Sequence, residues 1–297
     1  MQVDKTEIVK DYRPMAELVP VHWQNGAIEV TDGARIHYTR TGGAKPVVLL
    51  LHGLQGNGLM WLRTARALAA TYDVIMPDFR GHGQSSRVTT NWSAQMLVED
   101  MIELIHTLGL DQPYVVGHSL GADIAGRVAA VVPVRAVVLV DPALRNVAAA
   151  LAIDPDNPPP WMLAFMEMLQ ALKEQTHEQR LQTGLRLIPP GAPVWDEEDY
   201  VSFVEAEAQF DLKLHRYTSS MDYLCEMPEV IAHITCPLLL LTAHPGMPGL
   251  DIDELVAVWQ QHWQNGQHIH FPDSGHFIAA EQFDRFIDVL TRFLSEH

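Results

Sequence analysis

The stretch that decides the fold is residues 114–121, Tyr-Val-Val-Gly-His-Ser-Leu-Gly. A β-branched run ends at Gly117, and a segment with helical periodicity begins at Leu120. Ser119 lies between them in a G-x-S-x-G pattern, whose glycines are needed where a Cβ would clash with neighbouring backbone in a sharp strand-to-helix turn. Such a turn strains the serine and presents it at a helix amino end, where negative charge is stabilised. The stretch therefore predicts a nucleophilic serine suited to acyl transfer.

Further apolar runs surround this turn and alternate with helical segments. Continuous runs of this kind suit strands that are buried on both faces, so the alternation predicts a parallel α/β sheet covered by helices. An antiparallel hairpin, 27–30 and 35–40, leads into the sheet around the turn Asp32-Gly33. The expected strands are Val47–Leu51, Asp73–Met76, Tyr114–Gly117, Ala136–Val140, Pro237–Thr242 and Gln267–Phe271, and the expected helices are Met60–Ala70, Ser93–Leu108, Leu120–Val131 and Asp253–Trp263.

The strand rhythm stops once, between Asp141 and Thr235. A proline-rich stretch, 154–160, is followed there by helical segments near 161–175 and 197–223. We therefore expect a helical cap inserted between two core strands. The predicted organisation is an N-terminal extension at 1–26, a core formed by 27–141 and 236–297, and a cap at 142–235.

Several motifs together resemble those of the α/β-hydrolase superfamily, in its capped serine hydrolase branch. His52-Gly53 follows the expected strand Val47–Leu51 as in the family's HG motif, residues 78–85 (DFRGHGQS) match its D-x-R-G-H-G-x-S loop, and Ser274-Gly275-His276 matches its histidine loop. The resemblance covers about residues 27–297. It implies a mostly parallel, doubly covered sheet with an inserted helical cap, and it makes His276 the base that activates Ser119.

The resemblance also implies where the oxyanion is bound. The backbone N–H of Leu120, directly after the nucleophile, is one expected donor, and the N–H of Leu54 is the other. Gln55 is a weaker candidate through its side chain. A serine at position 119 argues against the dehalogenase and epoxide hydrolase branches, in which the nucleophile is an aspartate.

The third member of the triad departs from the family pattern. Most capped relatives carry an aspartate in the loop after the strand 237–242, but residues 243–248 (AHPGMP) hold no carboxylate. Asp251 or Asp253 can reach back from the following segment. Alternatively the acid is Asp141, at the end of the preceding core strand, because the carboxyl ends of parallel strands share one sheet edge. Asp141 is the preferred assignment, and the two others stay open.

Apolar side chains suggest the nature of the pocket. Trp61 lies near the oxyanion loop, and Trp161 and Phe165 share one face of a cap helix. Such a lining favours an uncharged hydrophobic ester or lactone, because burial of a charged substrate requires a paired cation. Arg145 and Arg216 are candidates for that cation, which leaves a carboxylate-bearing substrate open.

The function expected from these residues is hydrolysis of a carboxylic ester or lactone through an acyl-enzyme, without a cofactor. Other serine chemistry on the same fold competes with it: carbon–carbon bond hydrolysis, cofactor-free haloperoxidase activity and aminopeptidase activity. A non-catalytic ligand-sensing protein is a further alternative, favoured only by the missing late acid. His268 and His270 form a possible metal pair, but no further ligands are evident, so no metal is expected.

Composition limits the partners and the compartment. The 297 residues include 37 acidic and 20 basic side chains, a formal net charge of −17, which disfavours binding to nucleic acid or to an anionic membrane. Residues 1–20 lack the apolar stretch of a signal peptide, so we expect a soluble, cytoplasmic protein that acts on a small molecule. Cys225 and Cys236 are expected as free thiols, although a disulfide between them is conceivable. No oligomeric state is predicted.

Overall fold

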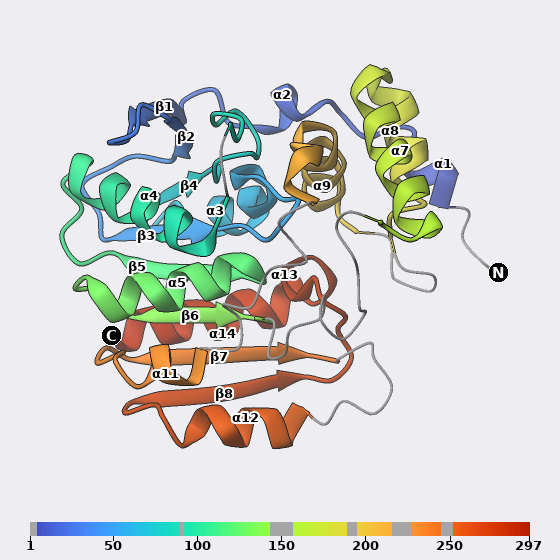
Figure 1. The fold of residues 1–297 in the computed structure, drawn as a ribbon. Helices are drawn as coiled ribbons and strands as arrows, with labels where there is room; N and C mark the ends of the chain where they lie inside the picture. The colour runs from blue at the N-terminus through green and yellow to red at the C-terminus, as the bar shows by residue number, and fades with distance from the viewer. Residues whose placement is uncertain (1–4, 90–91, 143–156, 189–194, 216–226, 245–251) are drawn as a thin grey trace.

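An eight-stranded sheet forms the centre of the molecule in the computed structural model, which describes residues 5–89, 92–142, 157–188, 195–215, 227–244 and 252–297. The strand order is β1-β2-β4-β3-β5-β6-β7-β8, with β1, β2 and β4 paired antiparallel and every other neighbour parallel (Figure 1). The α/β-hydrolase architecture expected from the sequence is thus present. The strands are β1 (Gln24–Glu29), β2 (Arg35–Arg40), β3 (Val47–Leu51), β4 (Asp73–Pro77), β5 (Tyr114–His118), β6 (Val137–Val140), β7 (Leu238–Ala243) and β8 (Gly266–Phe271).

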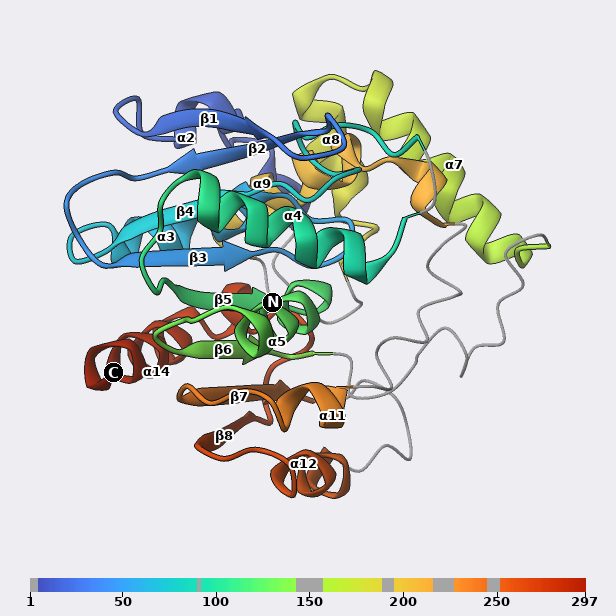
Figure 2. The same ribbon diagram turned by 60° about the vertical axis from the view of Figure 1, so that its left-hand side comes forward.

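Helices cover both faces of the sheet (Figures 1 and 2). Alternate residues of β3 show the two layers, because Leu49 packs with the apolar residues of one set of helices and Leu50 with those of the other. The first layer contains α4 (Ala94–Thr107), α5 (Leu120–Val131), α11 (Met227–Ile231) and α12 (Ile252–Gln260). The second contains the 3₁₀ turn η1 (Gly58–Trp61), α3 (Leu62–Leu68), α13 (Ile278–Glu281) and α14 (Phe283–Glu296).

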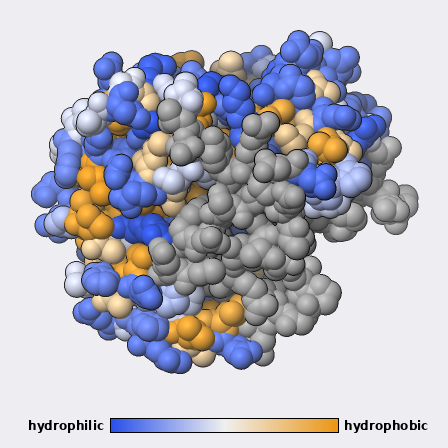
Figure 3. Space-filling model, in the orientation of Figure 1, coloured by the Kyte–Doolittle hydropathy of each residue, from blue (hydrophilic) through white to orange (hydrophobic). Residues whose placement is uncertain are grey.

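A group of helices lies apart from these layers, at the upper right of Figure 1. It consists of α7 (Pro160–Glu174), α8 (His177–Gly184), α9 (Glu197–Gln209) and the 3₁₀ turn η2 (Leu212–Leu214). The helix expected over 197–223 is wrong in its extent: the backbone is extended at Phe210, and the Asp211 carboxylate accepts from the Lys213 N–H to begin η2. Around α7 and α8 the visible surface is largely hydrophilic (Figure 3).

The segment before the sheet contacts these helices. It forms α1 (Lys5–Val9) and α2 (Met15–Leu18). The hydroxyl of Tyr12 donates to the carbonyl of Trp195 over 2.9 Å, and Arg13 pairs with Glu197 at the first residue of α9. Residues 5–23 therefore bind both to the sheet layers, through Arg66 and the Leu18 carbonyl, and to the start of α9.

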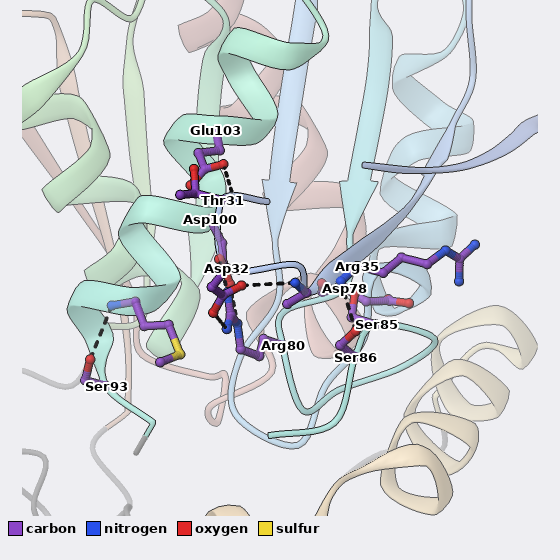
Figure 4. A network of polar contacts seen from close by, with 12 residues as sticks. Thr31, Asp32, Arg35, Asp78, Arg80, Ser85, Ser86, Ser93, Asp100 and Glu103 are labelled. Atoms are coloured by element: carbon purple, nitrogen blue, oxygen red, sulfur yellow. Dashed lines mark hydrogen bonds and ion pairs between the residues drawn. The ribbon is translucent and has the colours of Figure 1, made fainter. Parts of the chain in front are cut away.

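The loop 78–85 is held by an extensive polar network (Figure 4). Asp78 accepts from the N–H groups of Gly58 and Gln84 at 2.7 and 2.8 Å. Arg80 pairs with Asp100 of α4 and with Asp32 of the first hairpin turn. These contacts tie β4 to η1 and α4, so the loop braces the edge of the sheet where the site lies.

Two other expectations concern cysteine and the membrane. Cys236 is a free, half-buried thiol whose pKa is raised to about 11 by burial, and Cys225 lies outside the described residues. Within the described ranges, no helix combines the length and the apolar character needed to cross a bilayer.

Candidate active site

Ser119 sits on a strained turn between β5 and α5. Its φ of 53° and ψ of −120° lie outside the regions that a serine ordinarily occupies. A Cβ on Gly117 would lie 1.9 Å from the carbonyl oxygen of Gly121, and a Cβ on Gly121 would lie 2.4 Å from that of Leu51. Both glycines are therefore required by close backbone approach, which is the reason given by the G-x-S-x-G pattern.

His276 is paired with Asp141. Its Nδ1 lies 2.6 Å from Asp141 Oδ2, and the other carboxylate oxygen, Oδ1, accepts from the N–H of Ala243 at 2.8 Å. Asp141 has a φ of 44°, and its own N–H donates to the carbonyl of Leu241. Because both partners of the Asp141 backbone and carboxylate belong to β7, the end of that strand fixes the position of the acid.

The other two acid candidates differ in position. Asp253 lies on α12, near His268 of β8. Burial lowers the pKa of His268, and the negative charge of Asp253 offsets a small part of that lowering. Asp251 lies outside the described residues. Among the described carboxylates, the structure brings Asp141 to His276. Its catalytic role, like those of Ser119 and His276, stays a prediction at this point.

His118 is a participant that sequence reasoning missed. Its Nε2 donates to the carbonyl oxygen of His276 over 2.8 Å, and the centres of the two rings are 4.6 Å apart. Burial, with a smaller contribution from the neighbouring His276, lowers the pKa of His118 to about 3. A neutral ring with the proton on Nε2 therefore holds the backbone of the histidine loop. The sequence gives no sign of this role, because the hydrogen-bond partner of His118 lies 158 positions away.

The expected oxyanion donors come from two separate segments near Ser119. Leu120 is the first residue of α5, and Leu54 follows Gly53, where an added Cβ would be 3.1 Å from the Cβ of Ser119. Hydrogen bonds between described residues leave the N–H groups of both leucines unused. His52 anchors the loop, because its Nδ1 donates to the Gly53 carbonyl at 2.7 Å and its Nε2 accepts from Phe79. Two free amide donors thus flank the serine, as an oxyanion site requires.

Trp61 is buried behind the site. It is 3% exposed and lines, with His118, Trp195 and Asp199, a cavity of about 30 Å³. The indole N–H groups of both tryptophans have no partner, and Asp199 pairs with Arg63 at 2.9 Å. A cavity of this size holds about one or two water molecules. Trp61 therefore borders a small, mostly apolar cavity next to His118.

The two other expected pocket residues lie on α7. Phe165 is half-buried and meets the ring of His215 edge-on at 6.2 Å, whereas Trp161 is 57% exposed. The two candidate cations, Arg145 and Arg216, lie outside the described residues. The aromatic face of α7 is thus turned partly toward η2 and partly toward solvent.

His268 and His270 do share one face of β8. Both rings contact the hydroxyl of Thr242, at 2.8 and 2.9 Å. In the part of the chain that the structure describes, no group of three or more His, Cys, Asp or Glu side chains is arranged to hold a metal ion. The pair is accounted for by the threonine between the two rings.

Comparison with known proteins supports the architecture. A family model described as the alpha/beta hydrolase fold matches residues 46–183. An uncharacterized protein of Mycobacterium tuberculosis is 32% identical over 120 residues, which are 40% of this chain and 34% of that protein. The chain thus spans about a third of the length of this curated relative. A fluoroacetate dehalogenase of a Burkholderia species is 27% identical over 281 residues, covering 86% of this chain and 88% of the dehalogenase.

Solved structures share the fold across nearly the whole chain. The enol-lactonase from Burkholderia xenovorans has a TM-score of 0.66 and 20% identity, covering 91% of this chain and all of the lactonase. An E-2-(acetamidomethylene)succinate hydrolase has a TM-score of 0.68 and 20% identity, covering 92% of this chain and all of that structure. The sheet order, the strained serine turn and the match of residues 46–183 to the family model together show that the chain has the alpha/beta hydrolase fold.

Proposed function

We propose that this protein is a serine hydrolase that cleaves a carboxylic ester or lactone of a hydrophobic small molecule through an acyl-enzyme. The observation that carries the proposal is the 2.6 Å hydrogen bond between His276 Nδ1 and Asp141 Oδ2, together with the strained turn at Ser119. It supplies the acid that the usual loop lacks. The ligand-sensing alternative depended on that missing acid, so it has no remaining support of its own.

The chemistry follows from the proton positions. Because Nδ1 of His276 donates to Asp141, its Nε2 carries the lone pair that removes the proton from Ser119. The serine oxygen attacks the carbonyl carbon, and the resulting oxyanion receives hydrogen bonds from the N–H groups of Leu54 and Leu120. His276 then passes its proton to the leaving alcohol oxygen. A water molecule deprotonated by His276 attacks the acyl-enzyme and releases the acid and the free serine.

The choice of an ester or lactone has three supports. Position 119 holds serine rather than the aspartate expected for dehalogenase and epoxide hydrolase chemistry. The residue after His276 lies in aromatic surroundings: the ring of Phe277 is tilted against Trp195 at 4.9 Å and meets Phe203 edge-on at 5.5 Å. Such surroundings accept an uncharged acyl or alcohol group more readily than an ion. The lactonase among the structural neighbours is a third, weaker support, because it shares the fold alone.

The test is covalent labelling followed by turnover. A fluorophosphonate probe is expected to label the purified protein at Ser119, identified by peptide mass spectrometry, and not to label S119A. A series of p-nitrophenyl esters from acetate to decanoate, and a panel of lactones, then define the acyl size accepted. Absence of labelling on the folded protein would overturn the proposal. Release of fluoride from fluoroacetate without ester hydrolysis would instead assign carbon–halogen chemistry.

A further inference from the structure

Glu207 is a buried carboxyl that the proposed mechanism does not use. It lies near the end of α9 and is 4% exposed, and its Oε2 atom has no hydrogen-bond partner among the residues that the structure describes. Burial alone raises the pKa of Glu207 to about 8, so the side chain carries a proton at neutral pH. An unpaired buried polar atom costs about 1–3 kcal/mol. A bound molecule that pairs with such an atom removes this cost.

Other buried carboxyls in the described residues have partners. Burial raises the pKa of Asp100 to about 6 and that of Asp199 to about 7, but each forms an ion pair, Asp100 with Arg80 and Asp199 with Arg63. Those pairs account for the two aspartates as structural groups. Glu207 has neither a counter-ion nor a hydrogen bond at Oε2, which sets it apart from both.

The helical register turns Glu207 toward the candidate active site. Phe203, four residues earlier, contacts Phe277, the residue after His276, and Phe210, three residues later, contacts His82 at 5.1 Å. Residues at this spacing share one face of a helix. Glu207 therefore shares a face of α9 with Phe203, whose ring reaches the histidine loop. It also lies close in sequence to Phe210, which follows the helix and contacts His82 beside His52.

The loop that contacts Ser119 presents a second buried polar atom without a partner. It is Nε2 of Gln55, next to the expected oxyanion donor Leu54, in a residue with a φ of 65°. The side-chain amide of Gln55 on the core and the protonated carboxyl of Glu207 on α9 are both hydrogen-bond donors. Each can bind an oxygen, and the carboxyl can also accept from a hydroxyl.

We propose that Glu207 is a specificity residue that binds an uncharged hydroxyl or amide group of the substrate, away from the bond that is cleaved. This inference rests on the proposed ester or lactone hydrolysis and narrows its substrate class to hydrophobic compounds with one such polar group. An uncharged substrate group can form a hydrogen bond with the protonated Glu207 carboxyl, which stays neutral. A site built in this way discriminates against the analogue that lacks the group, because the carboxyl is then left unpaired.

The experiment compares matched esters on matched variants. The substrates are p-nitrophenyl hexanoate, its 3-hydroxy, 6-hydroxy and 6-amino derivatives, and the corresponding 6-amide. The variants are E207L, which removes the polar group at similar size, E207Q, which keeps a donor and an acceptor, and the control S202A. Ser202 is buried on the same helix, but its hydroxyl already bonds to the Asp199 carbonyl.

We expect at least one hydroxy or amide ester to have a kcat/KM about tenfold higher than that of the hexanoate. This ratio corresponds to one well-placed hydrogen bond. E207Q and S202A are expected to keep this ratio, and E207L to reduce it to about one while still hydrolysing the hexanoate. Equal ratios in wild type and E207L for every ester would overturn the inference. So would a dependence on Glu207 that appears with the amino ester alone.

Failure of the inference and failure of the proposed function give different results. A protein that is labelled by fluorophosphonate at Ser119 and hydrolyses the hexanoate, with ratios unaffected by E207L, is a hydrolase without this subsite. A protein that is not labelled contradicts the proposed function itself. E207L replaces an unpaired buried carboxyl with an apolar group, so we expect it to fold. E207M, which matches glutamate in length, serves as the second apolar variant.

Discussion

His118 Nε2 donates a 2.8 Å hydrogen bond to the carbonyl oxygen of His276, so the residue before the candidate nucleophile holds the backbone of the candidate base. The bond joins the serine turn to the histidine loop independently of any side-chain contact between Ser119 and His276. Since the pKa of His118 is about 3, this donor keeps one protonation state across the pH range in which a histidine base operates.

Loss of this hydrogen bond should lower kcat more than it weakens substrate binding. We expect H118A to lower kcat for an accepted ester by about five- to tenfold, the worth of roughly one hydrogen bond, with KM changed less than twofold. H118Q, which retains a donor, should recover part of the rate. H106A alters an exposed histidine on α4 and serves as the control. An unchanged kcat in H118A would show that the loop is held by its other contacts.

The acid can be assigned by paired substitutions. D141N removes the carboxylate bonded to His276 and is expected to lower kcat by about 10³- to 10⁴-fold, because the imidazole loses its tautomer and the stabilisation of its charged form. D253N and D251N should retain near wild-type activity. Circular dichroism and the melting temperature establish that each variant is folded. Full activity in D141N, with loss in D251N, would move the acid to the later loop.

The glycines of the serine turn should not tolerate a methyl group. In G121A the new Cβ would lie 2.4 and 2.5 Å from the carbonyl oxygens of Leu51 and His52, which are backbone atoms of a central strand and its loop. We expect a loss of at least about 3 kcal/mol, or roughly 6–12 °C in Tm. G126A on the same helix meets only the flexible end of Met227 and should melt within a few degrees of wild type. Thermal unfolding of the two variants compares them directly.

Stability should depend on pH through Glu207. Its folded pKa of about 8 is above the ordinary value of 4.5, so the folded state keeps a proton that the unfolded chain releases. Wild type is therefore expected to lose stability relative to E207Q as the pH rises from about 5 to 8, with no further change above that. The shift corresponds to a difference on the order of 5 kcal/mol. A difference in Tm between the two proteins that is constant from pH 5 to pH 9 would contradict this.

The core of the fold was predictable because its sequence pattern is local. The run 47–51 and the segment 120–131 have the bounds of β3 and α5, since buried parallel strands and the helices that cover them carry continuous apolar signals. The helix over 197–223 was predicted too long. Its periodicity continues past Phe210, and the break there depends on an aspartate cap that begins a separate turn. Competition between a helix and a local cap has no strong signature in composition.

The site was predictable where a motif fixes it. Ser119 and His276 lie in short patterns, and the elbow geometry at Ser119 follows from two glycines whose Cβ atoms have no room. Sequence spacing could not choose between Asp141 and Asp251, because the choice depends on how the ends of β6 and β7 lie relative to the histidine loop. His118 and Glu207 carry no motif at all, since the role of each follows from partners, or their absence, across the fold.

If Glu207 has the role proposed above, the contacts of Tyr12 and Arg13 connect residues 5–23 to substrate choice. They hold the start of α9, the helix that carries Phe203 and Glu207 farther along. We therefore expect a cut or a replacement within residues 5–23 to shift α9 while Ser119, His276 and Asp141 keep their positions. Removal of these residues is expected to change the relative kcat/KM of different esters before it abolishes hydrolysis.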